Sequence, residues 1–540
     1  MNAGYMEKIK MCAESEVILN GKTALGIEFG STRIKAVLID EQHKVLAIGS
    51  HVWETKLENG IWTYSLEDVW RGLQDSYKNL KEVVKRKYQI NLTRLGVIGL
   101  SGMQHGYMPF DKDDNLLVPM RTWRNTITGP ASVKLTELFN YPIPQRWSIA
   151  HLYQAILNQE AHLPQITYMT TVAGYVHWKL TGKKVVGINE ASGIFPIDLE
   201  TKTYNQRMIN QFHELIGENT VPWSLNEIFP EVLVAGQSAG VLTEVGAKLL
   251  DPSGETKAGI PMCPPEGDTG TGLVATNGIA VHSANISAGT SIYAAVVLEK
   301  ELKKAYTEID LGLTPDGNLF GMVHCNNCTS DLNGWIKLFD EVVGSVGFEV
   351  DKSEFYRVLY NKALEGDKDC GGLLSYNYLS GEHITGFEKG RPLFVRSQKC
   401  KFNLANFMRT HLYTCLGGIR LGMDLLLKEE DVIIDKIIAQ GGLFKTEKVG
   451  QSIVAAALNL PVSVMETAGE GGAWGMAVLA AYMKKQEEGE SFASYLTEKV
   501  FKDVQGVQVN PNPEDAAGFN RFMERYVKGL NIEKAAVECF

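Results

Sequence analysis

Short apolar runs separated by polar turns open the chain after a leader over residues 1–22. The runs cover 23–30, 34–40 and 45–52, and a glycine turn and a polar break connect them. Apolar runs of this length with tight connections are typical of antiparallel β-strands. The pattern therefore predicts a three-stranded meander near the start of the chain.

The pattern changes to a helical period after Ser65. Apolar side chains then recur every three or four residues, at Trp70, Leu73, Tyr77, Leu80 and Val84. This spacing predicts an amphipathic helix to about Tyr88, and Ser65 with Asp68 forms a variant N-capping pair. An apolar strand follows at 95–100. Strands that alternate with helices indicate an α/β architecture.

The second half of the chain repeats the strand, glycine turn and returning strand of the first. The repeat covers 285–298, and Gly289 lies at its turn about half a chain after Gly30. We interpret it as two structurally related halves that meet near Gly278. Further along the chain we expect a strand over 432–438, helices over 449–458 and 473–482, and a terminal helix after Pro513. The glycine-rich segment 469–472 directly precedes the helix over 473–482.

The composition is that of a globular protein. The chain has 540 residues, of which 44% are hydrophobic and 21% charged. Its length suggests about three to four domains or two large ones, and we divide it into 23–278, 279–485 and a helical appendage over 486–540. The formal net charge of −10 argues against a nucleic-acid binder, because binding to a phosphate backbone needs clustered positive charge.

Membrane insertion and disulfides are not expected from the sequence. Residues 1–19 hold no apolar stretch long enough for a signal peptide. The longest uncharged segment, 269–298, is rich in Gly, Ser, Thr and Asn, so we expect buried sheet and loops there. The eight cysteines are scattered, and Cys325 and Cys328 have no second pair near them for a zinc site. Free, largely buried thiols in a reducing cytoplasm are the expected state.

Two glycine turns are candidates for binding an anion. They are Gly30-Ser31-Thr32 and Gly289-Thr290-Ser291, one in each half. A glycine turn lets backbone N–H groups approach an oxyanion without a Cβ in the way, and neighbouring hydroxyls add donors. One such turn is more often an ordinary hairpin. Two equivalent turns would suit a polyphosphate held between two lobes.

Two further segments carry candidate chemistry. Asp268 lies among glycines at 266–272, where it could accept a proton from a substrate hydroxyl or help to hold Mg²⁺; an ordinary Asp-Gly-type turn is the alternative. Gln104 and His105 follow the strand over 95–100, at the end where α/β folds place ligand contacts. A structural histidine is the alternative for His105.

Taken in order, these segments resemble the FGGY carbohydrate kinase family, most nearly its xylulokinase-like pentulose kinases. The resemblance runs from about Ala24 to Tyr482. The segments that carry it are Gly26-Ile-Glu-Phe-Gly-Ser-Thr32, Ser101-Gly-Met-Gln-His-Gly106, Gly267-Asp268, Ser287-Ala-Gly-Thr-Ser291 and Gly441-Gly442 with Lys445, and Tyr378-Leu-Ser-Gly-Glu382 and the helix near 409–423 also fit. Each motif alone is unspecific, but five in the family's order are strong.

The resemblance implies a fold and a set of roles. The fold is two ribonuclease-H-like α/β domains, as in actin and heat-shock ATPases, with ATP and a small-molecule sugar meeting in the cleft between them. The N-terminal domain would bind the sugar and carry the first phosphate motif, and the C-terminal domain would bind the nucleotide. By position, Asp268 becomes the catalytic base; Gln104, His105, Trp123, Asp268 and Thr269 contact the ketose; Gly30, Ser31, Thr32, Gly289 and Thr290 approach the phosphates; Gly441, Gly442 and Lys445 contact adenosine; and Glu28 and Asp268 hold Mg²⁺.

Three departures from the family pattern bear on function. Glu28 stands where the family usually has Asp, the sugar motif reads Met-Gln-His rather than Gln-Met-His, and Trp123-Arg-Asn-Thr126 replaces a Trp-Asn-Asp-containing segment. We expect a cytoplasmic, ATP- and Mg²⁺-dependent kinase of a pentulose, and a homodimer is a possible assembly. The alternatives are a kinase of L-ribulose, a deoxy-ketohexose or sedoheptulose, and a non-catalytic nucleotide- or sugar-binding relative, which Glu28 keeps open.

Overall fold

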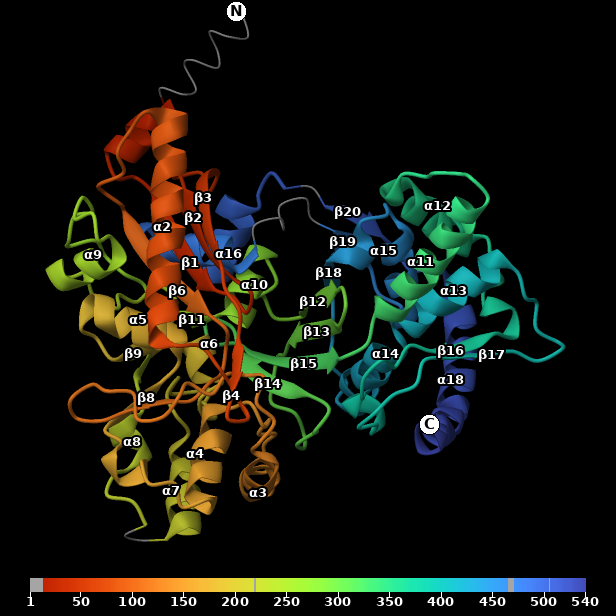
Figure 1. Ribbon diagram of the computed structural model, residues 1–540, viewed down its shortest axis with the longest axis horizontal. Coiled ribbons are helices and arrows are strands. Elements are labelled where there is room, and N and C mark those ends of the chain that lie inside the picture. The colour runs from red at the N-terminus through yellow and green to blue at the C-terminus, as the bar shows by residue number, and fades with distance from the viewer. Residues whose placement is uncertain (1–12, 218–219, 465–470, 505) are drawn as a thin grey trace, which may run out of the picture. The chain divides into compact units, whose positions relative to one another are not determined.

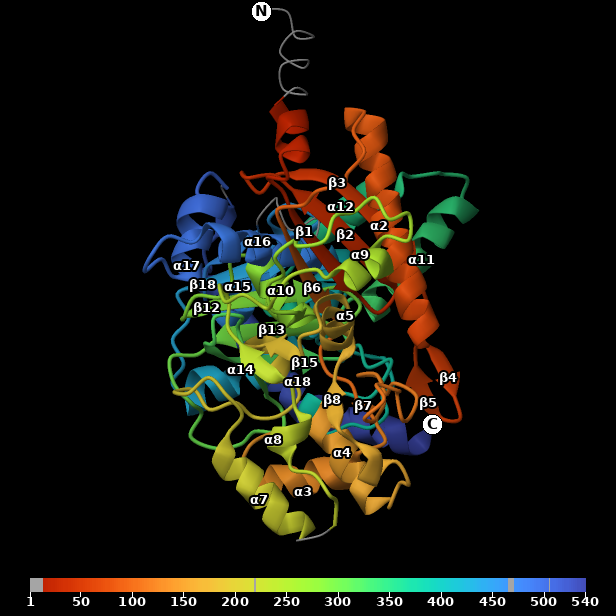
Figure 2. The same cartoon turned by 90° about the vertical axis from the view of Figure 1, so that its left-hand side faces the viewer.

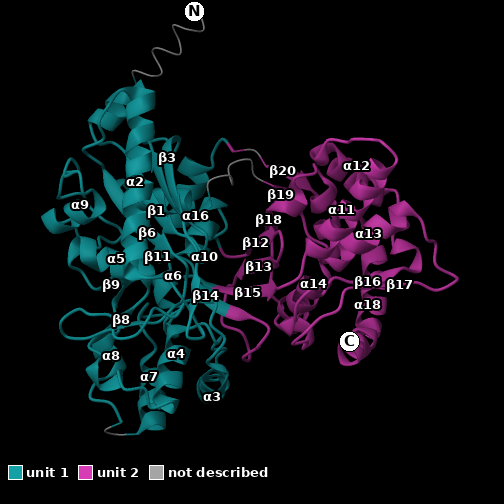
Figure 3. Cartoon of the chain, viewed as in Figure 1, with its two compact units in different colours: residues 1–280, 311–319, 467–503 teal, residues 281–310, 320–466, 504–540 magenta. Residues whose placement is uncertain are grey.

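The computed structural model describes residues 13–217, 220–464, 471–504 and 506–540 (Figure 1). The chain divides into two compact units (Figure 3). Unit 1 comprises the described residues of Met1–Ala280, Leu311–Leu319 and Thr467–Asp503. Unit 2 comprises those of Val281–Asp310, Phe320–Glu466 and Val504–Phe540.

A five-stranded sheet forms the centre of unit 1. Its strand order is β11-β6-β1-β2-β3, with bounds β1 (Ala24–Phe29), β2 (Arg33–Ile39), β3 (Val45–Val52), β6 (Val97–Gly102) and β11 (Glu266–Gly267). The first three strands are antiparallel, as the apolar runs predict, and β6 is parallel to both β1 and β11.

Two helices cover opposite faces of this sheet (Figures 1 and 2). Helix α2 (Leu66–Tyr88) begins at the predicted Ser65 cap and contacts β2 and β3. Helix α16 (Gly471–Lys485) packs so closely on β1 that a Cβ at Gly26 would lie 2.1 Å from the Ala473 carbonyl oxygen. Because side chains alternate along a strand, Glu28 faces α16 as Gly26 does.

The rest of unit 1 is mainly helical, with a second apolar cluster around α3, α4 and α7. Its helices are α3 (Gly129–Phe139), α4 (Ser148–Leu157), α5 (Val172–Thr181), α6 (Ile188–Ala191), α7 (Gln206–Ile216), α8 (Leu225–Ile228), α9 (Glu244–Leu250), α10 (Asp268–Ala275) and α17 (Phe492–Tyr495), with one-turn segments η1 (Leu163–Gln165) and η7 (Leu496–Val500). Its short strands are β4 (Lys56–Glu58), β5 (Ile61–Thr63), β7 (Met108–Phe110), β8 (Tyr168–Thr170), β9 (Val185–Gly187) and β10 (Glu231–Leu233).

Unit 2 repeats the strand order of unit 1. Its sheet runs β15-β13-β12-β18-β19-β20, with bounds β12 (Ser283–Ala288), β13 (Ile292–Val297), β15 (Leu319–Cys325), β18 (Lys436–Gln440), β19 (Val462–Val464) and β20 (Val507–Val509), and β14 (Asp310–Leu313) precedes β15 in the chain. Strands β12, β13 and β15 are antiparallel and β18 and β19 are parallel to β12, as β1, β2, β3, β6 and β11 are in unit 1. The prediction of two related α/β halves is therefore confirmed.

Helices and two short strands complete unit 2. They are α11 (Ser330–Ser345), α12 (Lys352–Leu364), α13 (Leu404–Thr414), α14 (Gly417–Asp424), α15 (Val449–Leu458) and α18 (Pro513–Cys539), with η2 (Cys370–Gly372), η3 (His383–Thr385), η4 (Leu425–Glu429), η5 (Gly442–Phe444), β16 (Leu374–Tyr376) and β17 (Leu393–Val395). Asn512 caps α18 by accepting from the backbone N–H groups of Glu514 and Asp515.

Several expectations need correction. Residues 268–275 are helical rather than sheet or loop, the predicted strand over 432–438 is β18 at Lys436–Gln440, and 409–423 holds two helices rather than one. Residues 486–540 do not form one helical appendage, because 486–503 group with unit 1 and β20 extends the sheet of unit 2.

The N-terminal leader lies partly outside the described residues, which begin at 13. Residues 13–19 are helical, and Ile18 belongs to the apolar core of unit 1. None of the helices in the described part of the chain combines the length and the apolar character needed to cross a membrane.

Candidate active site

Asp268 is the first residue of α10, directly after β11. Its Oδ1 accepts from the backbone N–H of Gln104 at 3.2 Å, and the N–H of Thr269 also points to the carboxylate. Burial raises the pKa of Asp268, whereas these backbone N–H groups and Arg146 oppose the rise. The residue is thus a partly buried carboxylate at a helix N-terminus and not part of an ordinary turn.

Glu28 lies on the face of β1 that contacts α16. A Cβ at Gly472 would lie 2.4 Å from Glu28 Oε1, so the glycine makes room for this longer carboxylate. Burial and the charge of Asp268 raise the pKa of Glu28 to about 7, against the backbone N–H of Ala473 and Lys35, its partner on β2. Two carboxylates that repel each other in this way suit a divalent cation, which prefers oxygen ligands.

Gln104 is tied to the protein through Asn189. Its Nε2 donates to the Asn189 carbonyl at 2.6 Å. The Asn189 side chain in turn accepts from the Gly270 N–H at 3.1 Å and donates to the Leu313 carbonyl at 2.7 Å. Asn189 therefore fixes both the Gln104 side chain and the first turn of α10, and sequence reasoning missed it.

His105 adopts a left-handed backbone conformation, with φ of 71°. Its ring is stacked on Trp147, and Nδ1 lies 3.4 Å from the Gly193 carbonyl. A Cβ at Gly193 would come within 2.6 Å of this ring, so the glycine allows the histidine its position. Burial lowers the pKa of His105 well below its usual value. A neutral ring with the proton on Nδ1 leaves Nε2 as an acceptor for a substrate hydroxyl.

Two buried acids lie behind Asp268. Glu190 and Glu266 have no solvent exposure, and the backbone N–H of Glu190 donates to Glu266 Oε2 at 3.1 Å. Burial raises the pKa of Glu190 to about 8 and that of Glu266 well above its usual value. Glu190 is therefore mainly protonated at neutral pH. The ionisable charge of this region comes from Asp268 and Glu28.

The first predicted phosphate hairpin, residues 30–32, joins β1 to β2. The Trp53 indole N–H donates to the Gly30 carbonyl at 2.7 Å, and the Trp123 indole N–H donates to Ser31 Oγ at 3.2 Å. Because Ser31 Oγ accepts this bond, its own proton remains available for an anion. Thr32 is exposed beside it.

Trp123 also borders a small pocket shared with His105. The pocket is lined by Met103, His105, Gly106, Met108, Met120, Arg121, Thr122, Trp123 and Val172. The indole, 41% exposed, thus stands between a sugar-motif residue and the first hairpin.

The second predicted phosphate hairpin, residues 289–291, joins β12 to β13 in unit 2. A Cβ at Gly289 would meet nothing within 4 Å, and Thr290 is exposed. A Cβ at Gly441, by contrast, would lie 2.4 Å from the Ala288 carbonyl oxygen, and Gly441 has φ of 103°. Gly441 therefore permits close packing at the base of this hairpin.

Gly442 and Lys445 lie beyond this contact, on the surface of unit 2. Gly442 has open space beside it and Lys445 is exposed. All three predicted adenosine residues are therefore exposed, and Gly441 in addition packs on Ala288. Gly469 and Glu470, in the glycine-rich segment 469–472, lie outside the described residues.

The cysteines form no metal centre among the residues that the structure describes. Cys325 and Cys328 are free and buried, as expected. Within the same part of the chain, no three His, Cys, Asp or Glu side chains are arranged to hold a metal ion. Any metal at Glu28 and Asp268 would therefore need ligands from a bound substrate, which is how Mg²⁺ is commonly held in kinases.

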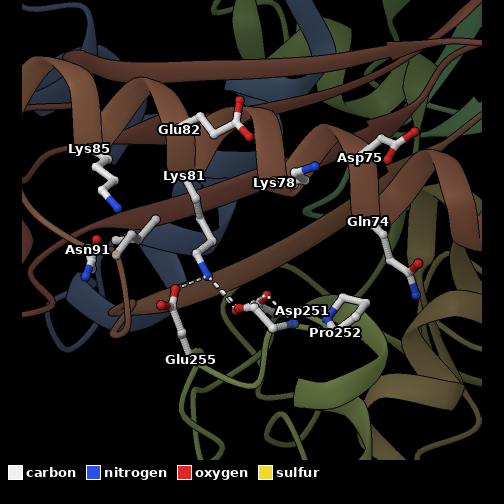
Figure 4. A pocket seen from close by; sticks show the side chains of 12 residues that line it. Gln74, Asp75, Lys78, Lys81, Glu82, Lys85, Asn91, Asp251, Pro252 and Glu255 are labelled. Carbon is white, nitrogen blue, oxygen red and sulfur yellow. Dashed lines mark hydrogen bonds and ion pairs between the residues drawn. The ribbon is translucent and has the colours of Figure 1, made fainter.

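A larger pocket of unit 1, of about 370 Å³, contains none of the predicted site residues. It lies between α2 and residues 251–255 (Figure 4). Lys81 bridges Asp251 at 2.8 Å and Glu255 at 2.7 Å across it, with 13% of its side chain exposed. This ion pair fastens α2 to the segment after α9.

Family models cover most of the chain. The model for the N-terminal domain of the FGGY family of carbohydrate kinases matches residues 23–274, and the model for its C-terminal domain matches 284–483. The chain therefore belongs to the FGGY family of carbohydrate kinases, and the family and the class of enzyme that its motifs indicate are confirmed.

Individual relatives are distant. The xylulose kinase of Haemophilus influenzae is 21% identical over 94% of this chain and 99% of its own length. A xylulose kinase structure from Rhodospirillum rubrum has a TM-score of 0.76 at 19% identity, covering 94% of this chain and 98% of its own. A gluconate kinase structure from Lactobacillus acidophilus also has a TM-score of 0.76, at 17% identity over the same shares. The fold is shared by kinases named for different sugars, so it does not identify the substrate.

Proposed function

We propose that the protein catalyses ATP-dependent phosphorylation of a ketose hydroxyl, with a pentulose as its substrate. The observation that carries this proposal is the position of Asp268. Its carboxylate begins a helix and accepts from the backbone of Gln104, next to His105. A carboxylate fixed beside two polar side chains is suited to take the proton of a bound alcohol.

In the proposed reaction, Asp268 accepts the proton of the ketose hydroxyl. The hydroxyl oxygen forms a bond to the γ-phosphorus of ATP, the bond between that phosphorus and the β–γ bridging oxygen breaks, and ADP leaves. His105 Nε2 accepts a hydrogen bond from a second hydroxyl and so orients the sugar. Gln104, Trp123 and Thr269 complete the ketose contacts. A positioned base contributes about 10²–10⁴-fold in rate. Positioning and charge stabilisation, on which phosphoryl transfer mainly depends, lower the rest of the activation barrier.

The nucleotide contacts in this proposal come from glycine hairpins. The Gly30 and Gly289 N–H groups close the two hairpins by donating to the Arg33 and Ser291 carbonyls at 3.1 and 2.9 Å. The phosphates would approach the turns at these glycines, where no Cβ obstructs them, and would bind the hydroxyls of Ser31, Thr32 and Thr290. Gly441, Gly442 and Lys445 would contact adenosine, and Gly441 also packs on Ala288.

Mg²⁺ fits the two carboxylates of unit 1. Glu28 and Asp268 would hold it together with phosphate oxygens, and the cation would supply neutralisation of phosphate charge. Burial and the charge of Asp268 raise the pKa of Glu28, which is the effect expected of negative charge at a site without a bound cation. The extra methylene of Glu28 is accommodated by Gly472, so its carboxylate can occupy this site despite its length.

A coupled assay of ADP release tests the proposal. The full-length protein with ATP and Mg²⁺ is given D-xylulose, L-ribulose, a 6-deoxy-ketohexose, sedoheptulose and gluconate in turn. We expect ADP release that depends on a ketose and is fastest with a pentulose. Release with a longer ketose only would correct the substrate class. ATP binding without release for any sugar would favour a non-catalytic binding protein and refute the proposal.

A further inference from the structure

The segment Tyr378-Leu-Ser-Gly-Glu382 has no part in the proposed chemistry, yet it ends on a buried acid. Glu382 immediately precedes η3 in unit 2, and its side chain is 1% exposed. A buried carboxylate is costly unless it is hydrogen-bonded or paired. Its partners therefore indicate what it does.

The main partner of Glu382 is Asn327. Glu382 Oε2 accepts from the Asn327 backbone N–H and from its Nδ2, both at 3.2 Å. The Asn327 side-chain oxygen accepts from the backbone N–H of Ser380 at 3.1 Å and from its hydroxyl at 3.2 Å. Asn327 is thus held from its backbone and its side chain by the 380–382 segment.

The next two residues of the chain hold the second phosphate hairpin. The Cys328 N–H donates to the Thr290 carbonyl at 2.9 Å. The N–H and the hydroxyl of Thr329 donate to the Gly289 carbonyl at 3.1 and 2.8 Å. These bonds occupy the hairpin carbonyls from behind, while the space beside the Gly289 Cα is open.

We propose that Glu382 is a positioning residue of the nucleotide site: its carboxylate fixes Asn327, and residues 328–329 thereby hold the 289–291 hairpin in its phosphate-binding conformation. The inference rests on the proposed function for its ligand, a nucleoside di- or triphosphate. Its subject is a residue that touches neither the nucleotide nor the sugar. Glu382 acts through Asn327, Cys328 and Thr329, which belong to the same unit.

The ionisation of Glu382 falls in a range that can be tested. Burial raises its pKa to about 7, while the Asn327 donors oppose the rise. The titratable groups around it are His383, whose Nδ1 lies 3.7 Å from Oε1, His324, which stacks on His383, and Cys325 and Tyr378. Helix α14 packs against it through Gly418, which adds no charge.

The sign of the pH effect follows from the acceptor role. The ionised carboxylate accepts strongly from both Asn327 donors, and the protonated acid accepts weakly. As pH falls through about 7, Glu382 gains a proton and the hydrogen bonds that it accepts from Asn327 weaken. Nucleotide affinity should therefore fall on acidification. A glutamine at 382 accepts equally at every pH.

The experiment measures the Kd of ADP by calorimetry with the full chain at about pH 6 and pH 8. The variants are Glu382→Gln and Glu382→Ala, with Glu430→Gln as the matched control. Glu430 is another buried acid of unit 2, and it accepts from Tyr306 Oη and the Lys303 N–H, away from the hairpin. The protonation of ADP itself changes with pH in the same way for every variant. A difference in pH dependence between the control and a Glu382 variant therefore reports on Glu382.

We expect ADP affinity to fall about threefold more between these pH values in the wild type and Glu430→Gln than in Glu382→Gln. Glu382→Ala should bind ADP about tenfold more weakly at pH 8. A Glu382→Gln variant with the pH profile of the wild type overturns the proposal, even if Glu382→Ala does not fold.

A Gly289→Val variant separates this proposal from the proposed function. Because its Cβ meets nothing in the protein, the change should leave the fold intact and obstruct the hairpin. Weaker ADP binding by Gly289→Val places the nucleotide at the hairpin, and the Glu382 comparison then decides the positioning role. Unchanged ADP binding by Gly289→Val refutes the nucleotide site and the Glu382 role together.

Discussion

The two glycine hairpins occupy the same position in two sheets of the same topology, but their surroundings differ in charge. Glu28 lies two residues before Gly30, and Ser287 lies two residues before Gly289. Glu28 is paired with Lys35 and Ser101 on its neighbouring strands. Ser287 is paired with Tyr293 and Gln440 at the matching places.

This difference suggests a division of labour between two copies of one scaffold. Unit 1 places the Glu28 carboxylate on the strand that enters its hairpin, which suits metal binding. Unit 2 places a hydroxyl and an amide there, which can bind an anion without repelling it. Because the backbone hairpin is shared, we expect the strand-end side chains to set the chemistry that we propose for each unit.

The largest expected effect comes from removing the base of unit 1. Asp268→Asn keeps the shape of the side chain but cannot accept a proton, so kcat should fall by about 10² or more. The Kd of ATP measured without Mg²⁺ should stay nearly unchanged, because the proposed nucleotide contacts of the protein itself lie at the hairpins and not at Asp268. Asp114→Asn, an exposed acid of the same unit, is the control. Full activity of Asp268→Asn would remove the residue from the mechanism.

The second prediction compares Gly441 and Gly442, the two glycines that directly follow β18 in unit 2. Gly441→Ala places a Cβ 2.4 Å from the Ala288 oxygen at a positive φ, so it should destabilise the protein by about 1–3 kcal/mol. Gly442→Ala, with open space, should change the free energy of unfolding by less than about 0.5 kcal/mol. Denaturant titration of both variants checks this. Equal stabilities would contradict the packing role of Gly441.

The third prediction concerns the acid that distinguishes the first hairpin. Glu28→Asp withdraws the carboxylate by about one carbon–carbon bond and leaves a gap beside Gly472. We expect the Mg²⁺ concentration for half-maximal ketose phosphorylation to rise about tenfold, with a smaller change in the KM of the ketose. Glu58→Asp, on the exposed strand β4, serves as the control. Identical Mg²⁺ titrations for Glu28→Asp and the wild type would argue against metal binding by Glu28.

Part of this comparison could be predicted from the sequence. The hairpins, the meander and α2 follow from patterns within about twenty residues, and the ordered motifs identify the family. The support of the site comes from distant residues. Asn189 fixes Gln104 from 85 positions away in sequence, and Gly472 accommodates Glu28 from the far end of unit 1.

The misplaced elements have a similar cause. Residues 268–275 are rich in Gly and Thr and lack a helical apolar period, yet they form α10 because α16 packs closely on them. A Cβ at Gly475 would lie 2.1 Å from the Thr271 carbonyl oxygen. Local propensity predicts a loop here, and tertiary packing overrides it. Residues 432–435 are as apolar as β18, but only Lys436–Gln440 align with β12.

The smallest expected effect is a pH dependence that unit 1 should show and the matching position of unit 2 cannot. In the folded protein without metal, the pKa of Glu28 is raised to about 7 from 4.5. Between these values the folded state binds more protons than the unfolded state, so this group lowers stability as pH rises through the window. Replacing Glu28 by Gln removes that loss. Relative to the wild type, Glu28→Gln should therefore gain about 1–2 kcal/mol in the free energy of unfolding between pH 5 and pH 8. Ser287→Ala, at the equivalent position, should show no such pH-dependent gain, since no titratable group is removed.

Urea titrations in a chelator at both pH values measure the difference, and added Mg²⁺ should reduce it if the cation binds the ionised carboxylate. A gain for Glu28→Gln that is the same at both pH values would show that Glu28 ionises as freely as an exposed acid, and the contrast between the two hairpins would then be one of shape rather than charge.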